Sequence, residues 1–218
     1  GTWNALAHNL GIPILIEEAI HLLTLPHRQI ALDALKIGDR NYLLNVGIGL
    51  SSSIMQSTRR HQKRRYGFLA YFGNLIVQAS GLRLRSFRVE VDGVEHRVKA
   101  SELMVVNGSI IGLGELPTVL EIHPGDGKVE IIAISAPTFW GLLRIGLRFL
   151  VGRRKKTPGF ISFTASRSII IRTPKRLVVE ADGDIIGHTP VEIHLVPSAV
   201  QVIVPEKPSP LRGIALFQ

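Results

Sequence analysis

From residue 85 onward, the sequence consists of short runs in which apolar and polar residues alternate, and turn-forming dipeptides separate these runs. Alternation with a period of two is typical of a strand with one buried face. Asp92-Gly93, between the runs 85–91 and 95–99, is a strong hairpin signal because glycine readily adopts the positive φ of a tight turn. The further strands that we expect are 102–106, 118–122, 128–134, 159–164, 168–173, 176–181, 191–196 and 199–204. So many short strands predict a sandwich or barrel of antiparallel strands.

Helical periodicity interrupts this pattern in three places. The first 25 residues predict short helices, one of which begins at Pro13, where a residue without an N–H is tolerated. Apolar residues at spacings of three and four predict a helix within 53–80, and another helix is expected from Pro137 to about Val151. The predicted fold class is therefore α+β, mainly an antiparallel β-sandwich with a few helices.

A second hairpin is expected closer to the N-terminus. The runs 29–37 and 41–48 flank Gly38-Asp39, which is a turn signal. Asp33 and Lys36 are the polar residues that we expect on the solvent side of this hairpin.

The composition excludes several classes of function. The 218 residues include no cysteine, which excludes a disulfide scaffold, cysteine-ligated zinc, iron–sulfur sites and thiol catalysis. The net charge of +9 favours anionic partners, namely phosphates, anionic lipid surfaces or nucleic acid. Nucleic acid is not expected, because aromatic residues are few and no motif that reads bases is recognisable.

The longest apolar stretch, 131–151, does not have the pattern of a membrane-spanning helix. Arg144 and Arg148 interrupt it and Pro137 lies inside it, whereas a spanning helix needs about 20 apolar residues. On a helix over its second half, the apolar arc is wider than one buried face needs. This pattern fits either a core helix with solvated charges or a helix that lies on an anionic membrane beside the basic run 153–156. We expect a cytoplasmic protein with peripheral membrane association.

Two carboxylates near the C-terminus are candidates for chemistry. Asp182-Gly183-Asp184 places them two residues apart, so that in extended backbone they project from one face. Two neighbouring negative charges raise the proton affinity of one carboxyl or recruit a cation, which suits a general base beside Mg²⁺ in phosphoryl transfer. The alternative is an ordinary hairpin turn, and the same alternative holds for Asp126-Gly127.

The first four residues, Gly1-Thr2-Trp3-Asn4, precede an expected helix. Amides at the start of a helix, with a threonine hydroxyl and an asparagine amide, form a plausible contact for an anion or a nucleotide. An ordinary helix cap is the alternative interpretation.

Several different short motifs follow one another along nearly the whole chain. They are Gly1-Thr2-Trp3-Asn4-Ala5-Leu6-Ala7, Leu10-Gly11-Ile12-Pro13, Asn45-Val46-Gly47-Ile48-Gly49-Leu50, Asn107-Gly108, Gly112, Gly114, Pro117-Thr118, Asp126-Gly127, Val179-Glu180-Ala181-Asp182-Gly183-Asp184 and Val196-Pro197-Ser198-Ala199-Val200. In this order they resemble segments of the diacylglycerol kinase and sphingosine kinase superfamily, which includes bacterial lipid kinases. The chain lacks the superfamily's Gly-Gly-Asp-Gly-Thr loop, so it resembles the second, β-rich domain with the last helices of the first.

The resemblance implies an organisation and an activity. Residues 1–26 would be a remnant of the nucleotide-binding domain, 27–205 the β-rich C-terminal lipid-kinase domain, similar to that of NAD kinases, and 206–218 a tail. The implied function is part of an ATP- and Mg²⁺-dependent kinase that transfers the γ-phosphate to a lipid hydroxyl of a diacylglycerol or a sphingoid-like lipid. The fragment alone is expected to be inactive, and a homodimer is possible.

The resemblance also assigns roles to single residues. Asp182 is the implied general base, and Asp184, where the family usually has Glu, is its catalytic and metal-binding neighbour. Asp126 resembles a position associated with Mg²⁺. Gly1, Thr2 and Asn4 would contact ATP.

An alternative function needs no catalysis. The chain could be a peripheral-membrane lipid-binding module, in which the helix 137–151 and the basic clusters make the contacts and Asp182 only forms a turn. Binding to anionic vesicles tests the membrane contact in either case.

Overall fold

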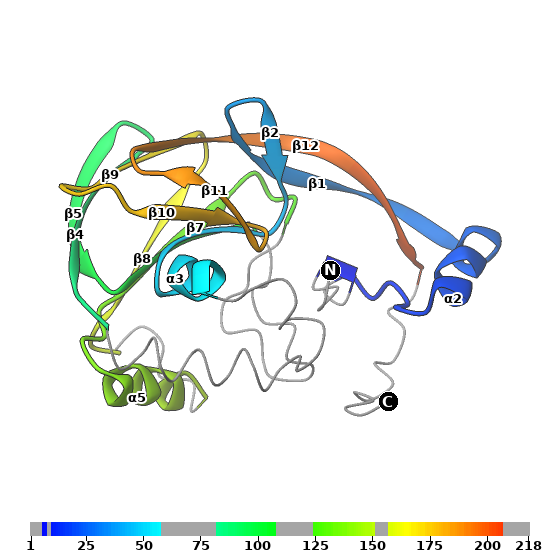
Figure 1. The fold of residues 1–218 in the computed structure, drawn as a ribbon. Helices are drawn as coiled ribbons and strands as arrows, with labels where there is room; N and C mark the ends of the chain where they lie inside the picture. The colour runs from blue at the N-terminus through cyan, green and yellow to red at the C-terminus, as the bar shows by residue number, and fades with distance from the viewer. Residues whose placement is uncertain (1–5, 8–9, 58–81, 108–123, 151–156, 207–218) are drawn as a thin grey trace.

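The computed structural model describes residues 6–7, 10–57, 82–107, 124–150 and 157–206 (Figure 1). Its strands are β1 His27–Ile37, β2 Arg40–Tyr42, β3 Asn45–Gly49, β4 Arg85–Val91, β5 Val94–Ala100, β6 Glu102–Val106, β7 Val129–Ile134, β8 Phe160–Ala165, β9 Ser168–Arg172, β10 Val178–Ala181, β11 Asp184–His188 and β12 Val191–Pro205. Its helices of three or more residues are α2 Ile16–His21, η1 Leu22–Thr24, α3 Leu50–Ser57 and α5 Phe139–Leu150.

The strands of the described residues form two antiparallel six-stranded sheets. The first sheet has the order β2-β1-β12-β9-β4-β5, and the second has the order β11-β10-β3-β6-β7-β8. The two sheets pack face to face, which confirms the predicted α+β fold with an antiparallel sandwich (Figure 1).

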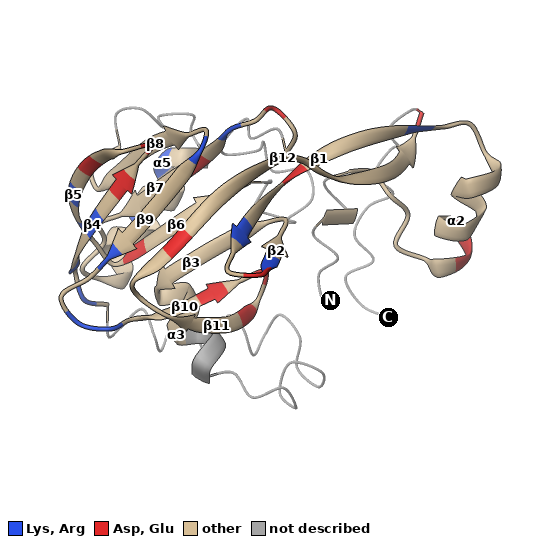
Figure 2. Cartoon of the chain, turned by 90° about the horizontal axis from the view of Figure 1, so that it is seen from above, with Lys and Arg blue, Asp and Glu red and all other residues tan. Residues whose placement is uncertain are grey.

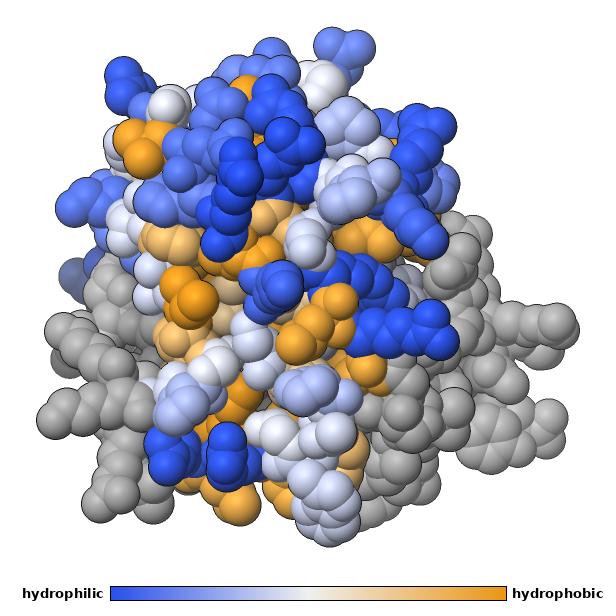
Figure 3. All heavy atoms as spheres, turned by 90° about the vertical axis from the view of Figure 1, so that its left-hand side faces the viewer, coloured by the Kyte–Doolittle hydropathy of each residue, from blue (hydrophilic) through white to orange (hydrophobic). Residues whose placement is uncertain are grey.

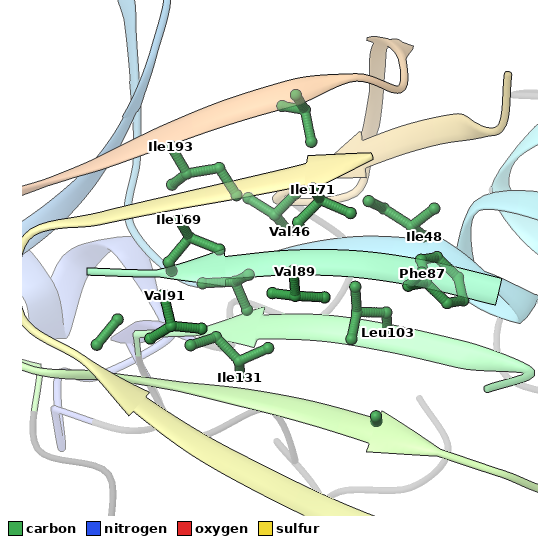
Figure 4. Close-up of a cluster of buried hydrophobic side chains, with 14 of the residues drawn as sticks. Val46, Ile48, Phe87, Val89, Val91, Leu103, Ile131, Ile169, Ile171 and Ile193 are labelled. Carbon is green, nitrogen blue, oxygen red and sulfur yellow. The ribbon is translucent and has the colours of Figure 1, made fainter. Parts of the chain in front are cut away.

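The core between the sheets follows from the alternation in the sequence. In β4, Phe87, Val89 and Val91 are buried, whereas Arg88 between them is exposed. Side chains from the second sheet meet them. Figure 4 labels ten members of this core, which come from both sheets: Val46, Ile48, Phe87, Val89, Val91, Leu103, Ile131, Ile169, Ile171 and Ile193. Burial of such side chains from both sheets, at about 1.5–3 kcal/mol each, is the main stabilising contribution.

The expected strand 41–48 is wrong in one respect. It is two strands in different sheets: β2 pairs with β1 in the first sheet, whereas β3 pairs with β6 and β10 in the second. Leu43 and Leu44 carry the chain from one sheet to the other. Both linking residues are apolar, so they read as part of one apolar strand and give no local signal of the crossing.

The expected strands 191–196 and 199–204 are one continuous strand, β12. Its first part pairs with β9 and its longer second part pairs with β1. The pairing with β1 changes register between Leu32 and Ala34, opposite Ser198, which has a φ of 52°. The break that the sequence predicted between 196 and 199 is therefore a β-bulge within one strand. β11, by contrast, was not predicted.

The same bulge corrects the expectation for Asp33, which is 1% exposed rather than on the solvent side. Its carboxylate accepts hydrogen bonds from the backbone N–H of Gly127, at 2.7 Å, and of Ser198, at 2.9 Å. A register shift moves a residue from one face of a strand to the other, so Asp33 turns inward and joins the 124–128 loop to β12.

α3 packs against the second sheet, whereas α2 lies beyond the sandwich (Figure 1). The long ribbon of β1 and β12 extends beyond it and carries α2, which begins at Ile16 rather than at Pro13 (Figure 1). α3 begins at Leu50, so the helix expected within 53–80 starts earlier, and residues 58–81 lie outside the described part. The expected strand 118–122 also lies outside it.

Within the residues that are described, no helix is both long and apolar enough to cross a bilayer. The domain boundaries at 26 and 205 stay predictions.

Candidate functional site

The turn between β10 and β11 carries the two predicted catalytic carboxylates. Asp182 has a φ of 49° and Gly183 a φ of 87°, the signature of a tight hairpin turn with positive φ at both central residues. Asp182 is therefore not in extended backbone, and the expectation that Asp182 and Asp184 share one face through extended geometry is wrong. Asp184 is the first residue of β11 and is exposed. Figure 2 marks the acidic residues of this hairpin in red.

The Asp182 carboxylate is held by backbone amides of the segment that links the two sheets. Its Oδ2 accepts the N–H of Leu43 at 2.8 Å, and its Oδ1 accepts those of Leu44 at 3.0 Å and Asn45 at 3.1 Å. The backbone N–H of Asp182 in turn donates to the carbonyl of Asn45 at 3.1 Å. The side chain is thus fixed in position while remaining exposed to solvent on its outer side.

Asp92, in the turn between β4 and β5, has the same geometry and serves as an internal comparison. It has a φ of 50°, and its carboxylate accepts the N–H groups of Ser166, Arg167 and Ser168 at 2.8 to 2.9 Å. Burial opposes ionisation, but these hydrogen bonds outweigh it and lower the pKa of Asp92 to about 2. In this fold, an aspartate in a hairpin turn can therefore serve only to hydrogen-bond the turn to another segment. The geometry at Asp182 is not by itself a sign of catalysis.

Two further carboxyls lie behind this turn, and sequence reasoning missed them as a pair. Glu180 of β10 and Glu102 of β6 are both buried, and their strands lie on either side of β3. α3 packs over this part of the second sheet, in contact with β3 and β10 (Figure 1). Glu180 accepts the Asn45 side-chain amide at Oε1, at 3.2 Å, and the N–H of Gly183 at Oε2, at 3.2 Å. Glu102 Oε2 accepts the N–H of Ser51, in the first turn of α3, at 3.0 Å.

Gly47 of β3 makes room for these carboxyls. A Cβ on Gly47 would lie 2.3 Å from Ser51 Oγ, 2.5 Å from Glu180 Oε1 and 3.3 Å from Glu102 Oε1. The side chains of both glutamates therefore converge over this glycine. Glu180 supports Asp182 through two routes: it binds Gly183 in the same turn and Asn45, which donates to Asp182.

The environment of the two glutamates favours their neutral forms. Burial raises the pKa of Glu102 to about 7 and that of Glu180 to about 7, and the charges of Glu102 and Asp182 raise the pKa of Glu180 further. The hydrogen bonds from Ser51 and Gly183 and the charge of Arg85 oppose these shifts without cancelling them. Both carboxyls therefore keep their protons to a higher pH than an exposed glutamate does, and they titrate as a coupled pair.

This pair gives a prediction for stability against pH. In the folded chain each carboxyl keeps its proton up to about 7, whereas the unfolded chain releases it near the ordinary value of 4.5. The folded state therefore binds more protons between these values, and the free energy of unfolding is expected to fall as pH rises from about 4.5 to about 7, and then to level off. Urea unfolding at a series of pH values measures this slope.

Two variants separate the pair from other titrating groups. Glu102→Gln keeps a neutral side chain of the same size, so it is expected to flatten the slope and to be more stable than the wild type above pH 7. Glu206→Gln, at an exposed site, is the control and should leave the slope unchanged. Equal slopes in all three proteins would contradict the assignment.

The predicted metal ligand Asp126 lies in the loop before β7. Its Oδ1 accepts the N–H of Lys128 at 2.9 Å, and the neighbouring Gly127 is bound to Asp33. A Cβ on Gly125 would lie 2.5 Å from the carbonyl oxygen of Ala31, so the loop packs closely on β1. Among the described residues no group of three or more His, Cys, Asp or Glu is placed to hold a metal ion. The metal roles of Asp126 and Asp184 stay predictions.

The predicted nucleotide contacts Gly1, Thr2 and Asn4 lie outside the described residues, and their role stays a prediction. Of the predicted site residues, the structure places Asp182 and Asp184 in one hairpin and adds Glu180 beside them. The sequence did not single out Glu102 and Glu180 as a pair, because each is a lone carboxyl in a mainly apolar strand and the two strands lie far apart in the sequence. Among the described residues, α3 packs over this part of the second sheet.

Comparison with known proteins agrees with this fold. Residues 45–204 match the family model described as "YegS C-terminal NAD kinase beta sandwich-like domain". Similar curated proteins include "Putative lipid kinase SERP0390" of Staphylococcus epidermidis, which is 26% identical over 93% of this chain, and "Putative lipid kinase SH2167" of Staphylococcus haemolyticus, which is 27% identical over 93%. The chain spans 66% and 65% of the lengths of these two relatives.

A solved structure shares the fold as well. A crystal structure of a "putative diacylglycerol kinase" from Bacillus anthracis has a TM-score of 0.72 and 25% identity, and the match covers 94% of this chain and 66% of the other. The family model, the relatives and the sandwich thus agree with the motifs noted above. The chain belongs to the family of YegS C-terminal NAD kinase β-sandwich-like domains, within the diacylglycerol kinase-like lipid kinase superfamily.

Proposed function

We propose that this chain is the lipid-side part of a kinase that transfers the γ-phosphate of ATP to the hydroxyl of a lipid, a diacylglycerol or a sphingoid-like lipid, with Mg²⁺. The observation that carries the proposal is the family match over residues 45–204, together with relatives whose names are those of lipid kinases. We also propose that the protein acts in the cytoplasm, in peripheral contact with a membrane.

In this mechanism Asp182 takes the proton from the lipid hydroxyl as its oxygen attacks the γ-phosphorus. Three backbone amides fix the carboxylate, so it needs no reorganisation to act as a base. Its exposed side is free to accept a further hydrogen bond from a hydroxyl group. Glu180 and Asn45 support the turn from behind and thereby keep the base in place.

The exposed carboxylates fit the preference of Mg²⁺ for hard oxygen ligands. Asp184 and Asp126 each present an exposed carboxyl group, and we propose these two residues as its ligands. When bound, Mg²⁺ neutralises charge on the transferred phosphoryl group. Gly1, Thr2 and Asn4 are the proposed contacts of this chain with ATP.

The proposal predicts where activity is found. The 218-residue chain alone is expected to show no lipid phosphorylation, because positioning of the ATP phosphates supplies most of the catalysis and this chain has no Gly-Gly-Asp-Gly-Thr loop. A longer protein that contains this chain after such a loop is expected to transfer ³²P from ATP to lipid in mixed micelles. Activity of the 218-residue chain by itself, or inactivity of the longer protein on every lipid alcohol tested, would contradict the proposal.

A second candidate function is a lipid-binding module without catalysis. It is favoured by Asp92, whose carboxylate makes the same contacts as that of Asp182 with no predicted chemical role. The activity of the longer protein separates the two candidates, since only the kinase produces a phosphorylated lipid.

A further inference from the structure

The helix α5 presents apolar side chains to solvent. Trp140 is 73% exposed, Leu147 is 55% exposed and Leu143 is 41% exposed. At intervals of three and four residues these three side chains lie on one face of the helix. A tryptophan with most of its surface exposed is unusual in a folded protein, because its large apolar ring gains free energy on burial.

The opposite face of α5 holds the helix to the sandwich. Ile145 is 5% exposed, and the ring of Phe149 packs edge-on against that of Phe160 in β8, with 4.7 Å between the centroids. The outward face is therefore not needed to attach the helix. The helix is apolar on both sides, as the wide apolar arc in the sequence indicated, and among the described residues only one side packs against the sandwich.

Positive charge accompanies the exposed face. Arg144 is exposed and lies beside Trp140, one helical turn along. In the sequence from residue 131 to residue 166 there are six Lys or Arg and no Asp or Glu, and four of the six form the run 153–156 directly after the helix.

We propose that the outward face of α5, made of Trp140, Leu143, Arg144 and Leu147, docks on a lipid bilayer with anionic headgroups. An apolar stripe flanked by arginine matches the boundary between acyl chains and negative headgroups, where tryptophan side chains concentrate. A nucleic acid backbone would offer no apolar surface for Leu143 and Leu147 to contact. The inference rests on the proposed function only in that the substrate is a lipid in a membrane.

The position of this face suits contact with a planar surface. Figure 1 shows α5 on the outside of the sandwich, at the end away from α2 and the ribbon of β1 and β12. Figure 3, which views this side, shows hydrophobic side chains open to solvent among hydrophilic ones.

Vesicle binding of the 218-residue chain tests the inference. With vesicles of phosphatidylcholine and phosphatidylglycerol at low salt, co-sedimentation is expected, and it should weaken in high salt and on pure phosphatidylcholine. Trp140→Ala/Leu147→Ala is expected to reduce the partition coefficient at least about 10-fold, because two apolar side chains no longer enter the interface. Arg144→Gln is expected to reduce it about fivefold.

Matched variants at other exposed positions provide the controls. Ile16→Ala/Leu23→Ala removes apolar side chains of similar exposure near α2, and Arg40→Gln removes an exposed arginine of β2. These variants should bind vesicles like the wild type. Equal losses in both sets, or no binding of the wild-type chain to anionic vesicles at low salt, overturn the inference. Failure here leaves the kinase assay in detergent micelles unaffected, so the two proposals fail separately.

Tryptophan fluorescence reports on the face directly. The chain has two tryptophans, so Trp3→Phe leaves Trp140 as the only one. Its emission is expected to shift to the blue on anionic vesicles and to be quenched by brominated lipids. Binding without any change in this emission would place the contact elsewhere and would also overturn the inference.

Discussion

Replacement of Asp182 by asparagine is expected to lower the rate of lipid phosphorylation by about 10²- to 10⁴-fold in the longer protein that contains this chain. The amide cannot accept the proton of the lipid hydroxyl. Asparagine also accepts at only one oxygen, whereas the carboxylate accepts three backbone N–H groups, so the variant should lose about 1–3 kcal/mol of stability as well.

Asp92→Asn separates these two effects. Asp92 makes the same contacts in another hairpin, so its replacement should cost a similar free energy of unfolding. Its effect on the rate is expected to be small, because no chemistry is assigned to that turn. Urea unfolding and the initial rate of phosphorylation are measured on both variants at a temperature where both are folded. Equal activities of the two variants would remove Asp182 from the proposed mechanism.

Gly47→Ala is expected to have the largest effect on stability of any substitution considered, about 2–4 kcal/mol. The new Cβ would lie 2.3 Å from Ser51 Oγ and 2.5 Å from Glu180 Oε1, and β3 has a neighbour on each side, so the strand has little freedom to move. The glutamate must then swing away, which also breaks its hydrogen bonds to Asn45 and Gly183.

Gly146→Ala is the matched control for this substitution. Apart from the backbone of its own helix, no atom lies within 4 Å of the position of its Cβ, and it lies within α5, where alanine favours the helix over glycine. This variant should be as stable as the wild type or more stable by up to about 1 kcal/mol. Thermal or urea unfolding compares the two, and a Gly47→Ala protein of wild-type stability would contradict the packing described around Glu180.

The hairpins could be predicted because the signal for a hairpin lies in residues that are adjacent in the sequence. At Asp92-Gly93, the residue pair itself specifies the positive φ of the turn, and the alternation on either side specifies which face is buried. The same local signal gave a turn at Asp182-Gly183 only as the alternative interpretation, and the strand after it, with its exposed Ile185, did not have a clear period of two.

Other features could not be predicted because they depend on contacts distant in sequence. Nothing in Leu43-Leu44 distinguishes a continuing strand from a crossing between sheets, and the carboxylate that stabilises the crossing belongs to residue 182. Glu102 and Glu180 are single carboxyls in mainly apolar strands, and their meeting across β3 depends on the order of the strands in the second sheet. Asp33 is likewise turned inward by a bulge that depends on pairing with residues near 198.

The order of the strands along the chain has a consequence for how this molecule folds. The chain passes between the two layers repeatedly, and the first layer closes only when residue 27 meets residue 205. The strands of the second layer all lie between residues 45 and 188, inside the span of the first layer, so no single cut yields two halves that each contain a whole sheet. Such a topology has a high contact order, so we expect folding on the millisecond-to-second scale and little tolerance for circular permutation within the interleaved strands.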